Sequence, residues 1–128
     1  MTCAARPPVV LLVEDEMFVR MTTCDMLEDA GFTVLEAGDC AAALALLRQA
    51  GRVDLLVSDV GLPDMDGVTL YAACRELCPD LPAIFITGYG QDQMVQEMRE
   101  APHARVLGKP FQQRDLSAAI SELLPAAV

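Results

Sequence analysis

Basic residues are scarce in this chain of 128 residues. Nine Lys and Arg face nineteen Asp and Glu, which gives a formal net charge of −10 at pH 7. A surface this acidic repels the phosphates of DNA and RNA. We therefore expect no direct binding to nucleic acid.

The sequence also lacks an N-terminal apolar run long enough for a signal peptide or a membrane span. The run at Val9–Val13 covers five residues and leads directly into the acidic residues Glu14–Glu16. A signal peptide and a membrane-spanning helix both need a longer apolar stretch without charged residues. We expect a cytoplasmic protein that does not enter a membrane.

A third absence is the C-x-x-C pair. The five cysteines form an odd set whose spacing fits neither a disulfide framework nor a zinc site. We expect reduced thiols without a redox function at Cys3, Cys24, Cys40, Cys74 and Cys78.

The composition is that of one globular domain. Hydrophobic residues make up 53% of the chain and charged residues 22%, and a chain of this length buries a core without disulfides or a structural metal. The expected organisation is a flexible tail at 1–8, a domain at 9–124 and a C-terminal tail at 125–128.

Short apolar runs alternate with helical patterns along the domain. Strands are expected at 9–13, 32–36, 55–57, 81–87 and 105–108. Helices are expected at 16–30, from Asp39 to Gly51, from Asp66 to Pro79, at 91–100 and after Phe111, the fourth being the least firmly anchored. This alternation predicts a doubly wound α/β fold: a five-stranded parallel sheet with helices on both faces. The alternation does not fix the strand order, but small sheets of this type commonly take the flavodoxin-like order 2-1-3-4-5.

Polar residues stand at the carboxyl ends of four expected strands: Glu14 and Asp15, Asp59, Thr87, and Lys109. Parallel strands end at the same edge of a sheet, so these side chains should meet in one crevice. Three crowded carboxylates repel one another and require protons or a cation. Mg²⁺ suits such a site because it binds one or two carboxylates and a phosphate oxygen.

This arrangement predicts phosphoryl transfer. The Asp59 carboxylate can attack a phosphoryl group to form an acyl phosphate, while Lys109 and Thr87 hold the charge that develops on the phosphoryl oxygens. Each residue alone also has a purely structural explanation, such as a helix start, a turn or a surface lysine. Only the combination of these residues points specifically to phosphoryl transfer.

These residues resemble the receiver domain of bacterial two-component response regulators over 9–124. The shared motifs are Glu14-Asp15, the D-x-x-x-P-x-x-D-G run from Asp59 to Gly67, Thr87 after the fourth strand, and Lys109-Pro110-Phe111. Separations of 44, 28 and 22 residues between Asp15, Asp59, Thr87 and Lys109 also agree with the family.

The resemblance implies roles for individual residues. Asp59 would receive the phosphoryl group from a phosphohistidine, and Thr87 and Lys109 would contact it. Asp15, Asp59 and the backbone carbonyl of Gly61 would ligate Mg²⁺, with Glu14 acting through water. In the family the Lys-Pro peptide, here Lys109-Pro110, is usually cis. Such a domain is no enzyme, since it catalyses only its own phosphorylation and dephosphorylation.

The output side departs from the family pattern. Most receivers carry Tyr or Phe three residues before the lysine as a rotating switch, and this chain has Val106. The stretch Phe85–Gly90 is instead similar to a subgroup with a Phe-Ala-Thr-Gly-x-Tyr-like motif. We expect Tyr89 and the fourth helix to rearrange on phosphorylation, with Gly88 and Tyr89 setting the acyl-phosphate lifetime in opposite directions.

The partners follow from the same resemblance. A sensor histidine kinase or phosphotransfer protein would supply the phosphoryl group. No DNA-binding segment follows the last helix, so output is expected through contact of a downstream protein with the face formed by the fourth helix, fifth strand and fifth helix. The chain itself is expected to be a monomer or weak dimer.

Two other functions compete with this one. A haloacid-dehalogenase-like phosphatase uses similar chemistry but needs a second aspartate two residues after the nucleophile, where this chain has Gly61. A phosphorylation-independent interaction module would keep the fold, but such degenerate receivers usually lose an acidic residue, the Thr or the Lys. A nucleotide or flavin domain is disfavoured because no glycine-rich phosphate motif follows the first strand.

Overall fold

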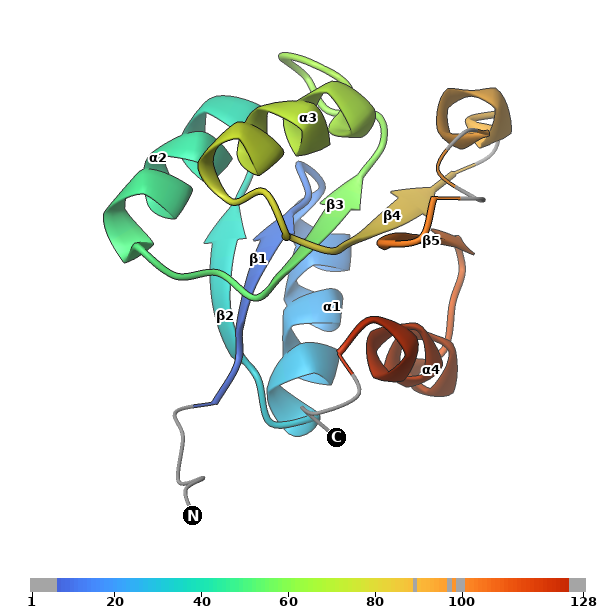
Figure 1. Ribbon diagram of the computed structural model, residues 1–128. Helices are drawn as coiled ribbons and strands as arrows, with labels where there is room; N and C mark the ends of the chain where they lie inside the picture. Colours follow the sequence, from blue (N-terminus) through green and yellow to red (C-terminus); the bar gives the residue numbers. More distant parts are fainter. Residues whose placement is uncertain (1–6, 89, 97, 99–100, 125–128) are drawn as a thin grey trace.

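Five parallel strands form one sheet in the order β2-β1-β3-β4-β5, as the sequence predicts (Figure 1). The computed structural model describes residues 7–88, 90–96, 98 and 101–124. Most of the predicted N-terminal tail and all of the C-terminal tail at 125–128 lie outside these residues. The strands are β1 Val9–Val13, β2 Thr33–Ala37, β3 Leu55–Asp59, β4 Ala83–Thr87 and β5 Ala104–Gly108.

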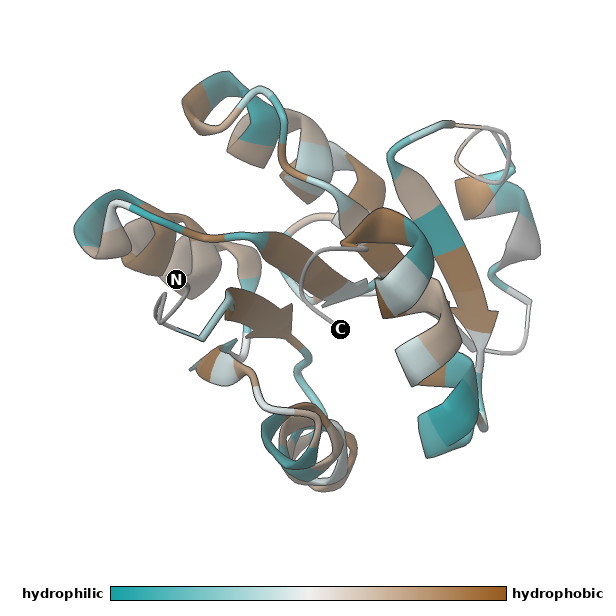
Figure 2. Ribbon diagram, turned by 60° about the horizontal axis from the view of Figure 1, so that its bottom comes forward, coloured by the Kyte–Doolittle hydropathy of each residue, from teal (hydrophilic) through white to brown (hydrophobic). Residues whose placement is uncertain are grey.

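Helices cover both faces of the sheet. In Figure 1, α1 (Met17–Asp29) and α4 (Gln113–Leu123) lie on one face, and α2 (Cys40–Ala50) and α3 (Gly67–Leu77) lie on the other. Adjacent strand residues point to opposite faces. Leu11 thus belongs to the core under α2 and α3, and Leu12 to the core under α1 and α4. Figure 2 shows strands that are mostly hydrophobic and helices in which hydrophobic and hydrophilic residues are mixed.

The central strands are buried along their whole length. Every residue of β3 and β4 is buried, including the polar Ser58, Asp59 and Thr87. A strand covered by helices on both faces requires a continuous apolar run rather than alternation. The same burial places the ends of these strands, and their polar residues, next to the core.

Local signals in the sequence set the helix boundaries. The carboxylates of Asp39 and Asp66 accept hydrogen bonds from Ala42 N and Thr69 N and so cap α2 and α3. Gly51 ends α2 in the left-handed conformation, with φ of 70°. No helix in the described part of the chain is both long and apolar enough to cross a membrane.

The predicted helix at 91–100 is wrong as an α-helix over the described residues. The structure has a four-residue 3-10 helix there, η2 (Asp92–Val95), while residues 97, 99 and 100 lie outside the described part. Gly90 before it has φ of 81°, and no side chain caps it. Among the described side chains of this segment, Val95 is fully buried and Met98 is half-buried. These described residues supply little buried apolar surface to stabilise an α-helix.

Candidate functional site

The ends of β1 and β3 bring three acidic side chains together. A carboxylate oxygen from each of Glu14, Asp15 and Asp59 lies within 4.8 Å of the others. Glu14 and Asp59 are buried, with 2% and 5% of their surface exposed, whereas Asp15 faces solvent. The predicted cluster is therefore present, and it is open on the side of Asp15.

Lys109 reaches into this cluster from the end of β5. Its Nζ lies 3.1 Å from Asp59 Oδ2 and 3.3 Å from Glu14 Oε1. Its backbone N–H donates to the Thr87 carbonyl at 2.8 Å, which fixes the start of the side chain beside β4. Burial alone would lower the pKa of Lys109, but the hydrogen bond to Asp59 and the nearby negative charges raise it. The lysine is therefore a fixed positive charge.

Glu14 is the electrostatically strained member of the cluster. Burial raises its pKa to about 7; the Glu16 N–H opposes the shift and the Asp59 charge adds to it. Oε2 accepts that N–H at 3.1 Å, but Oε1 accepts no hydrogen bond from any described residue. The 3.3 Å approach of Lys109 to Oε1 is thus a charge contact without hydrogen-bond geometry. A buried oxygen without a donor, facing two further carboxylates, fits a cation site.

The loop after β3 holds Asp59 in place. Gly61 N–H donates to Asp59 Oδ1 at 3.2 Å. Gly67 lies so close to the Asp59 carbonyl that a Cβ would overlap it. Further along, the Asp64 carboxylate accepts hydrogen bonds from Cys40 N and Ala41 N, both at 3.0 Å, and so ties the loop to α2.

The end of β4 forms the other wall. Thr87 is buried, and its hydroxyl makes a long hydrogen bond of 3.4 Å to the Leu107 carbonyl. Gly88 N–H donates to the side chain of Gln91 at 2.6 Å. Tyr89 lies outside the described residues, so its predicted part in the response stays a prediction. The Lys109-Pro110 peptide is cis, as the resemblance implies.

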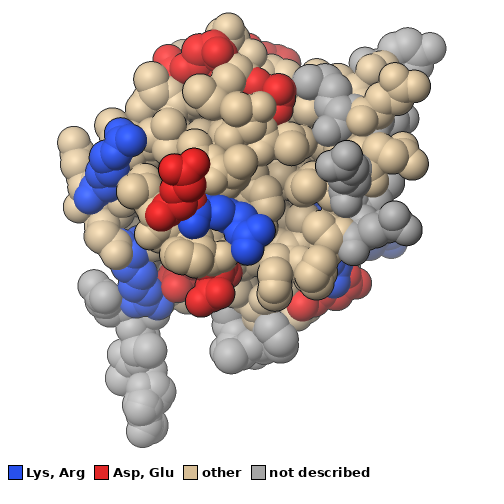
Figure 3. Space-filling model, turned by 45° about the horizontal axis from the view of Figure 1, so that its top comes forward, with Lys and Arg blue, Asp and Glu red and all other residues tan. Residues whose placement is uncertain are grey.

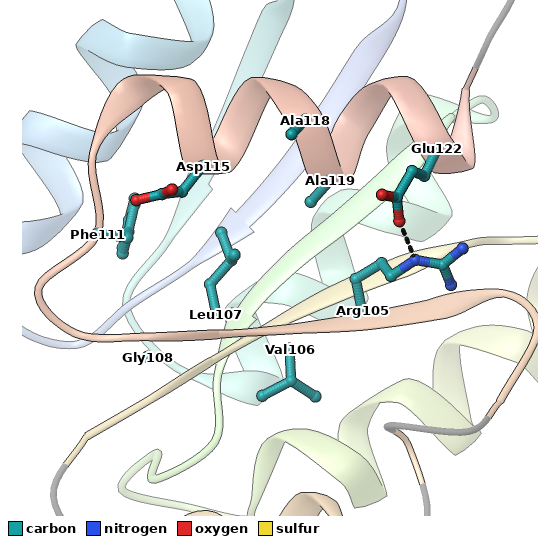
Figure 4. A pocket seen from close by; sticks show the side chains of 9 residues that line it. All are labelled: Arg105, Val106, Leu107, Gly108, Phe111, Asp115, Ala118, Ala119 and Glu122. Atoms are coloured by element: carbon teal, nitrogen blue, oxygen red, sulfur yellow. Dashed lines mark hydrogen bonds and ion pairs between the residues drawn. The ribbon is translucent and has the colours of Figure 1, made fainter.

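Val106 points away from α4. In Figure 4, Leu107 and Arg105 project from β5 toward α4, and Val106 projects to the other side of the strand. There it packs against the core that contains Val95 of η2. Met98 also packs against that core, and Phe111 packs against the opposite one.

A groove of about 350 Å³ separates β5 from α4 (Figure 4). Arg105 crosses one end and forms a 2.6 Å ion pair with Glu122. Phe111 and Asp115 line the other end. The groove lies on the outer edge of the sheet, well separated in sequence from the acidic cluster.

Two features were missed by the sequence reasoning. The first is Gln91, whose contacts depend on space left by glycines and have no sequence signature. The second is a group of exposed apolar side chains at the start of α1, Met17, Phe18 and Met21. Their spacing on the helix surface opposite Thr23 and Leu27 could have revealed the second feature.

The described cysteines are free thiols, as predicted. Burial, the largest cause in each case, raises the thiol pKa to about 12 for Cys24 and Cys40 and to about 11 for Cys74. Thiols that stay protonated are poor nucleophiles and poor metal ligands.

Charge is unevenly spread around the strand ends. Figure 3 shows this side obliquely, with acidic and basic side chains in contact on a surface that is otherwise largely uncharged. A site that combines fixed carboxylates with the half-buried Lys109 can hold a cation and, beside it, an incoming anion.

Known proteins share this fold and are similar to this chain in sequence. A response regulator receiver protein from Sinorhizobium medicae WSM419 superposes with a TM-score of 0.83 at 28% identity, covering 95% of this chain and 98% of that one. The receiver protein CpdR of Brucella abortus (strain 2308) is 36% identical over 118 residues, 92% of this chain and 98% of CpdR. Sensor kinase CckA of the same organism is 40% identical over 116 residues, but this chain spans only 12% of its length.

The fold and the site thus define a signalling domain of the phosphoacceptor class. Residues 10–121 match the response regulator receiver domain, and the chain belongs to this family. The match is to a signalling domain and indicates no enzyme family, so neither the phosphatase nor the phosphorylation-independent alternative is favoured.

Proposed function

We propose that Asp59 takes a phosphoryl group from the phosphohistidine of a sensor histidine kinase or phosphotransfer protein, in a Mg²⁺-dependent reaction. The observation that carries this proposal is the buried Asp59 carboxylate, 3.1 Å from Lys109 Nζ and grouped with Glu14 and Asp15. A carboxylate so placed is a nucleophile with a cation beside it.

The transfer is a displacement at phosphorus. A carboxylate oxygen of Asp59 forms the new P–O bond, and the P–N bond to the donor imidazole breaks. The imidazole nitrogen keeps the electron pair and takes up a proton. Lys109 donates to the transferred group, and the Thr87 hydroxyl gives up its 3.4 Å contact with Leu107 to do the same.

The residues of the cluster fit Mg²⁺. Asp15, Asp59 and the Gly61 carbonyl would hold it, with Glu14 acting through water, and the unbonded Glu14 Oε1 provides the acceptor for that water. When bound, the ion neutralises the carboxylates and the phosphoryl oxygens as the two anions approach. The only reactions catalysed are the domain's own phosphorylation and its later hydrolysis.

The exposed apolar group on α1 gives the donor a place to dock. Met17, Phe18 and Met21 follow the acidic residues 14–16 directly in the chain, so a protein seated on them lies next to Asp59. We assign this surface to the helix that carries the donor histidine, because that helix must approach the strand ends. The surface would bury large side chains that are otherwise left in water.

Output follows through changed contacts of the segment 91–98, β5 and α4 with a downstream protein. The groove between β5 and α4 lies on this face (Figure 4). Four residues would modulate the response: Gly88, Tyr89, Val106 and Pro110. The domain acts as a monomer or weak dimer, in the cytoplasm.

The test is incubation with Mg²⁺ and a small phosphodonor such as acetyl phosphate, followed by intact mass measurement. Wild type should gain one phosphoryl group, and chelation of Mg²⁺ should prevent it. Asp59→Asn should gain none, while Asp80→Asn, an exposed aspartate away from the cluster, should behave as wild type. A phosphoryl adduct on Asp59→Asn with a native circular dichroism spectrum would overturn the assignment.

A further inference from the structure

The side chain of Gln91 spans the gap between the ends of β3 and β4. At one end of its carboxamide, Oε1 accepts the Gly88 N–H at 2.6 Å. At the other end, Nε2 lies against Gly61, in space that a Cβ on Gly61 would fill. Gly61 has no side chain to keep the carboxamide out.

This position is beside the phosphoacceptor. Gly61, which contacts Nε2, donates its own N–H to Asp59 Oδ1 at 3.2 Å. Gly88, which holds Oε1, directly follows Thr87 at the end of the neighbouring strand. The carboxamide therefore closes the crevice between the two strand ends next to the Asp59 carboxylate.

We propose that Gln91 is a latch that a phosphoryl group on Asp59 displaces. The inference rests on the proposed function. A phosphoryl group brings anionic acceptor oxygens, and a backbone N–H binds an anionic acceptor more strongly than a neutral carboxamide oxygen. The Gly88 N–H therefore changes partner from Gln91 Oε1 to the phosphoryl group, and the Gln91 side chain leaves the crevice.

Release of the latch reaches the output side through the backbone. Gln91 directly precedes η2, and its own N–H donates to the Gly88 carbonyl at 3.2 Å. Gly90 between them has φ of 81°, a conformation that other residues rarely adopt. Val95 of η2 then packs into the same core as Val106. A change at Gln91 is thus transmitted to β5 without an aromatic side chain at position 106.

The latch predicts opposite effects of substitutions at one position. Gln91→Ala and Gln91→Leu remove the acceptor for Gly88 N–H, so phosphorylation by acetyl phosphate should be about two- to tenfold faster, the factor that one net hydrogen bond supplies. Gln91→Glu keeps an acceptor and adds a negative charge beside Asp59, so it should be slower than wild type. Gln93→Ala, at an exposed glutamine two residues along, is the matched control and should not change the rate.

A second measurement follows the hydrogen bond itself. In amide spectra of the unphosphorylated protein, the Gly88 resonance should move upfield in Gln91→Ala and Gln91→Leu and stay in place in Gln93→Ala. A structural role for Gln91 alone would not give rates that rise with Ala and fall with Glu. Equal rates in all four variants, or an unmoved Gly88 resonance, would overturn the latch while phosphorylation of wild type at Asp59 persists. Failure of wild type to take a phosphoryl group would instead overturn the proposed function and the latch together.

Discussion

The chain leaves the sheet twice beside the phosphoacceptor, and the two exits differ. After β3 it enters the 11-residue α3, which is capped by Asp66 and buries Leu70, Tyr71 and Cys74. After β4 it enters the four-residue η2, which has no side-chain cap and is anchored by Val95 among the described residues. Both exits start at the same edge of the sheet, yet fewer of the described side chains are buried in the second.

The two exits therefore have different tasks. The exit after β3 holds Asp59 in position, and the exit after β4 responds to its phosphorylation. The β3 exit fixes the acceptor through contacts within the loop and with α2, and a nucleophile has to be held in position to react. Among the described residues, the β4 exit lies beside the site at Gly88 and at the Gln91 carboxamide. Segments with few buried apolar contacts are those that rearrange at low free energy. The phosphoacceptor and the segment that responds to it thus lie at the ends of neighbouring strands, and the segments that follow these two strands are anchored differently.

The largest effect should come from removing an anchor of α3. Leu70 is fully buried, so Leu70→Ala should lower the free energy of unfolding by about 2–5 kcal/mol. Val95→Ala deletes two methyl groups under η2 and should lower the free energy of unfolding by only about 2 kcal/mol. Urea denaturation measures both, and equal losses would mean that the two exits are anchored alike.

The next effect is electrostatic. The folded-state pKa of Glu14 is about 7, compared with 4.5 for an unperturbed glutamate. In metal-free buffer the folded state therefore holds the Glu14 proton more tightly, and the free energy of unfolding should fall by about 3 kcal/mol as pH rises from below 4.5 to above 7. Urea denaturation at pH 4.5 and pH 8 in a chelator should show this loss.

Glu14→Gln should remove this pH dependence, because an amide does not ionise. Glu28→Gln, at an exposed position of α1, should retain it. Added Mg²⁺ should restore stability at pH 8 in wild type more than at pH 4.5, because the ion binds the ionised carboxylate. A pH dependence that survives Glu14→Gln would contradict the assignment to this residue.

Two glycines on the β3 exit give a third contrast. A Cβ at Gly67 would meet the Asp59 carbonyl and the Val60 backbone, which have no room to shift, so Gly67→Ala should lower stability by about 1–3 kcal/mol. A Cβ at Gly61 would meet only the end of the Gln91 side chain, so Gly61→Ala should change stability by less than about 0.5 kcal/mol.

Gly61→Ala should nevertheless speed phosphorylation, because the added methyl group pushes Nε2 of Gln91 from the crevice. The double variant with Gln91→Ala should show no further gain if both act on one contact. Thermal denaturation and acetyl phosphate kinetics on the same samples make the comparison. Additive rate gains would mean that Gly61 acts separately from Gln91.

The smallest effect concerns helix caps. Asp66 accepts hydrogen bonds from the backbone N–H of Thr69 at 2.7 Å and from its hydroxyl at 3.0 Å, so Asp66→Ala should lower the free energy of unfolding by about 1 kcal/mol. Gln91 precedes η2 without capping it, so Gln91→Ala should stay within about 0.5 kcal/mol of wild type. An equal loss in both would show that Gln91 supports the fold rather than the response.

The strand order and the acidic cluster could both be predicted. Continuous apolar runs such as Val9–Val13 indicate strands buried on both faces, and the helices between successive runs are the crossover connections that parallel strands require. Parallel strands end at one edge, which brings Glu14 and Asp15 to Asp59 although more than 40 residues separate them. The same reasoning places Lys109, whose side chain is long enough to cross from β5.

The segment 91–100 was predicted incorrectly over its described residues, because its apolar spacing suits an α-helix but the described side chains supply little buried surface to form one. The side of β5 on which Val106 lies depends on strand register, which a short run does not fix. Gln91 is the clearest omission, since its contacts arise from two glycines that are 27 residues apart in the sequence and adjacent only in the folded sheet.

The sequence by itself determined which side chains lie at the carboxyl edge of the sheet, because periodicity and connection length leave few ways to arrange five parallel strands. Tertiary structure alone decided their chemistry. Burial leaves one oxygen of Glu14 without a hydrogen-bond donor and raises its pKa to about 7. The absence of a side chain at Gly61 admits the carboxamide of Gln91, which the Gly88 N–H then binds. These properties depend on distances between segments remote in the chain, and only packing sets those distances.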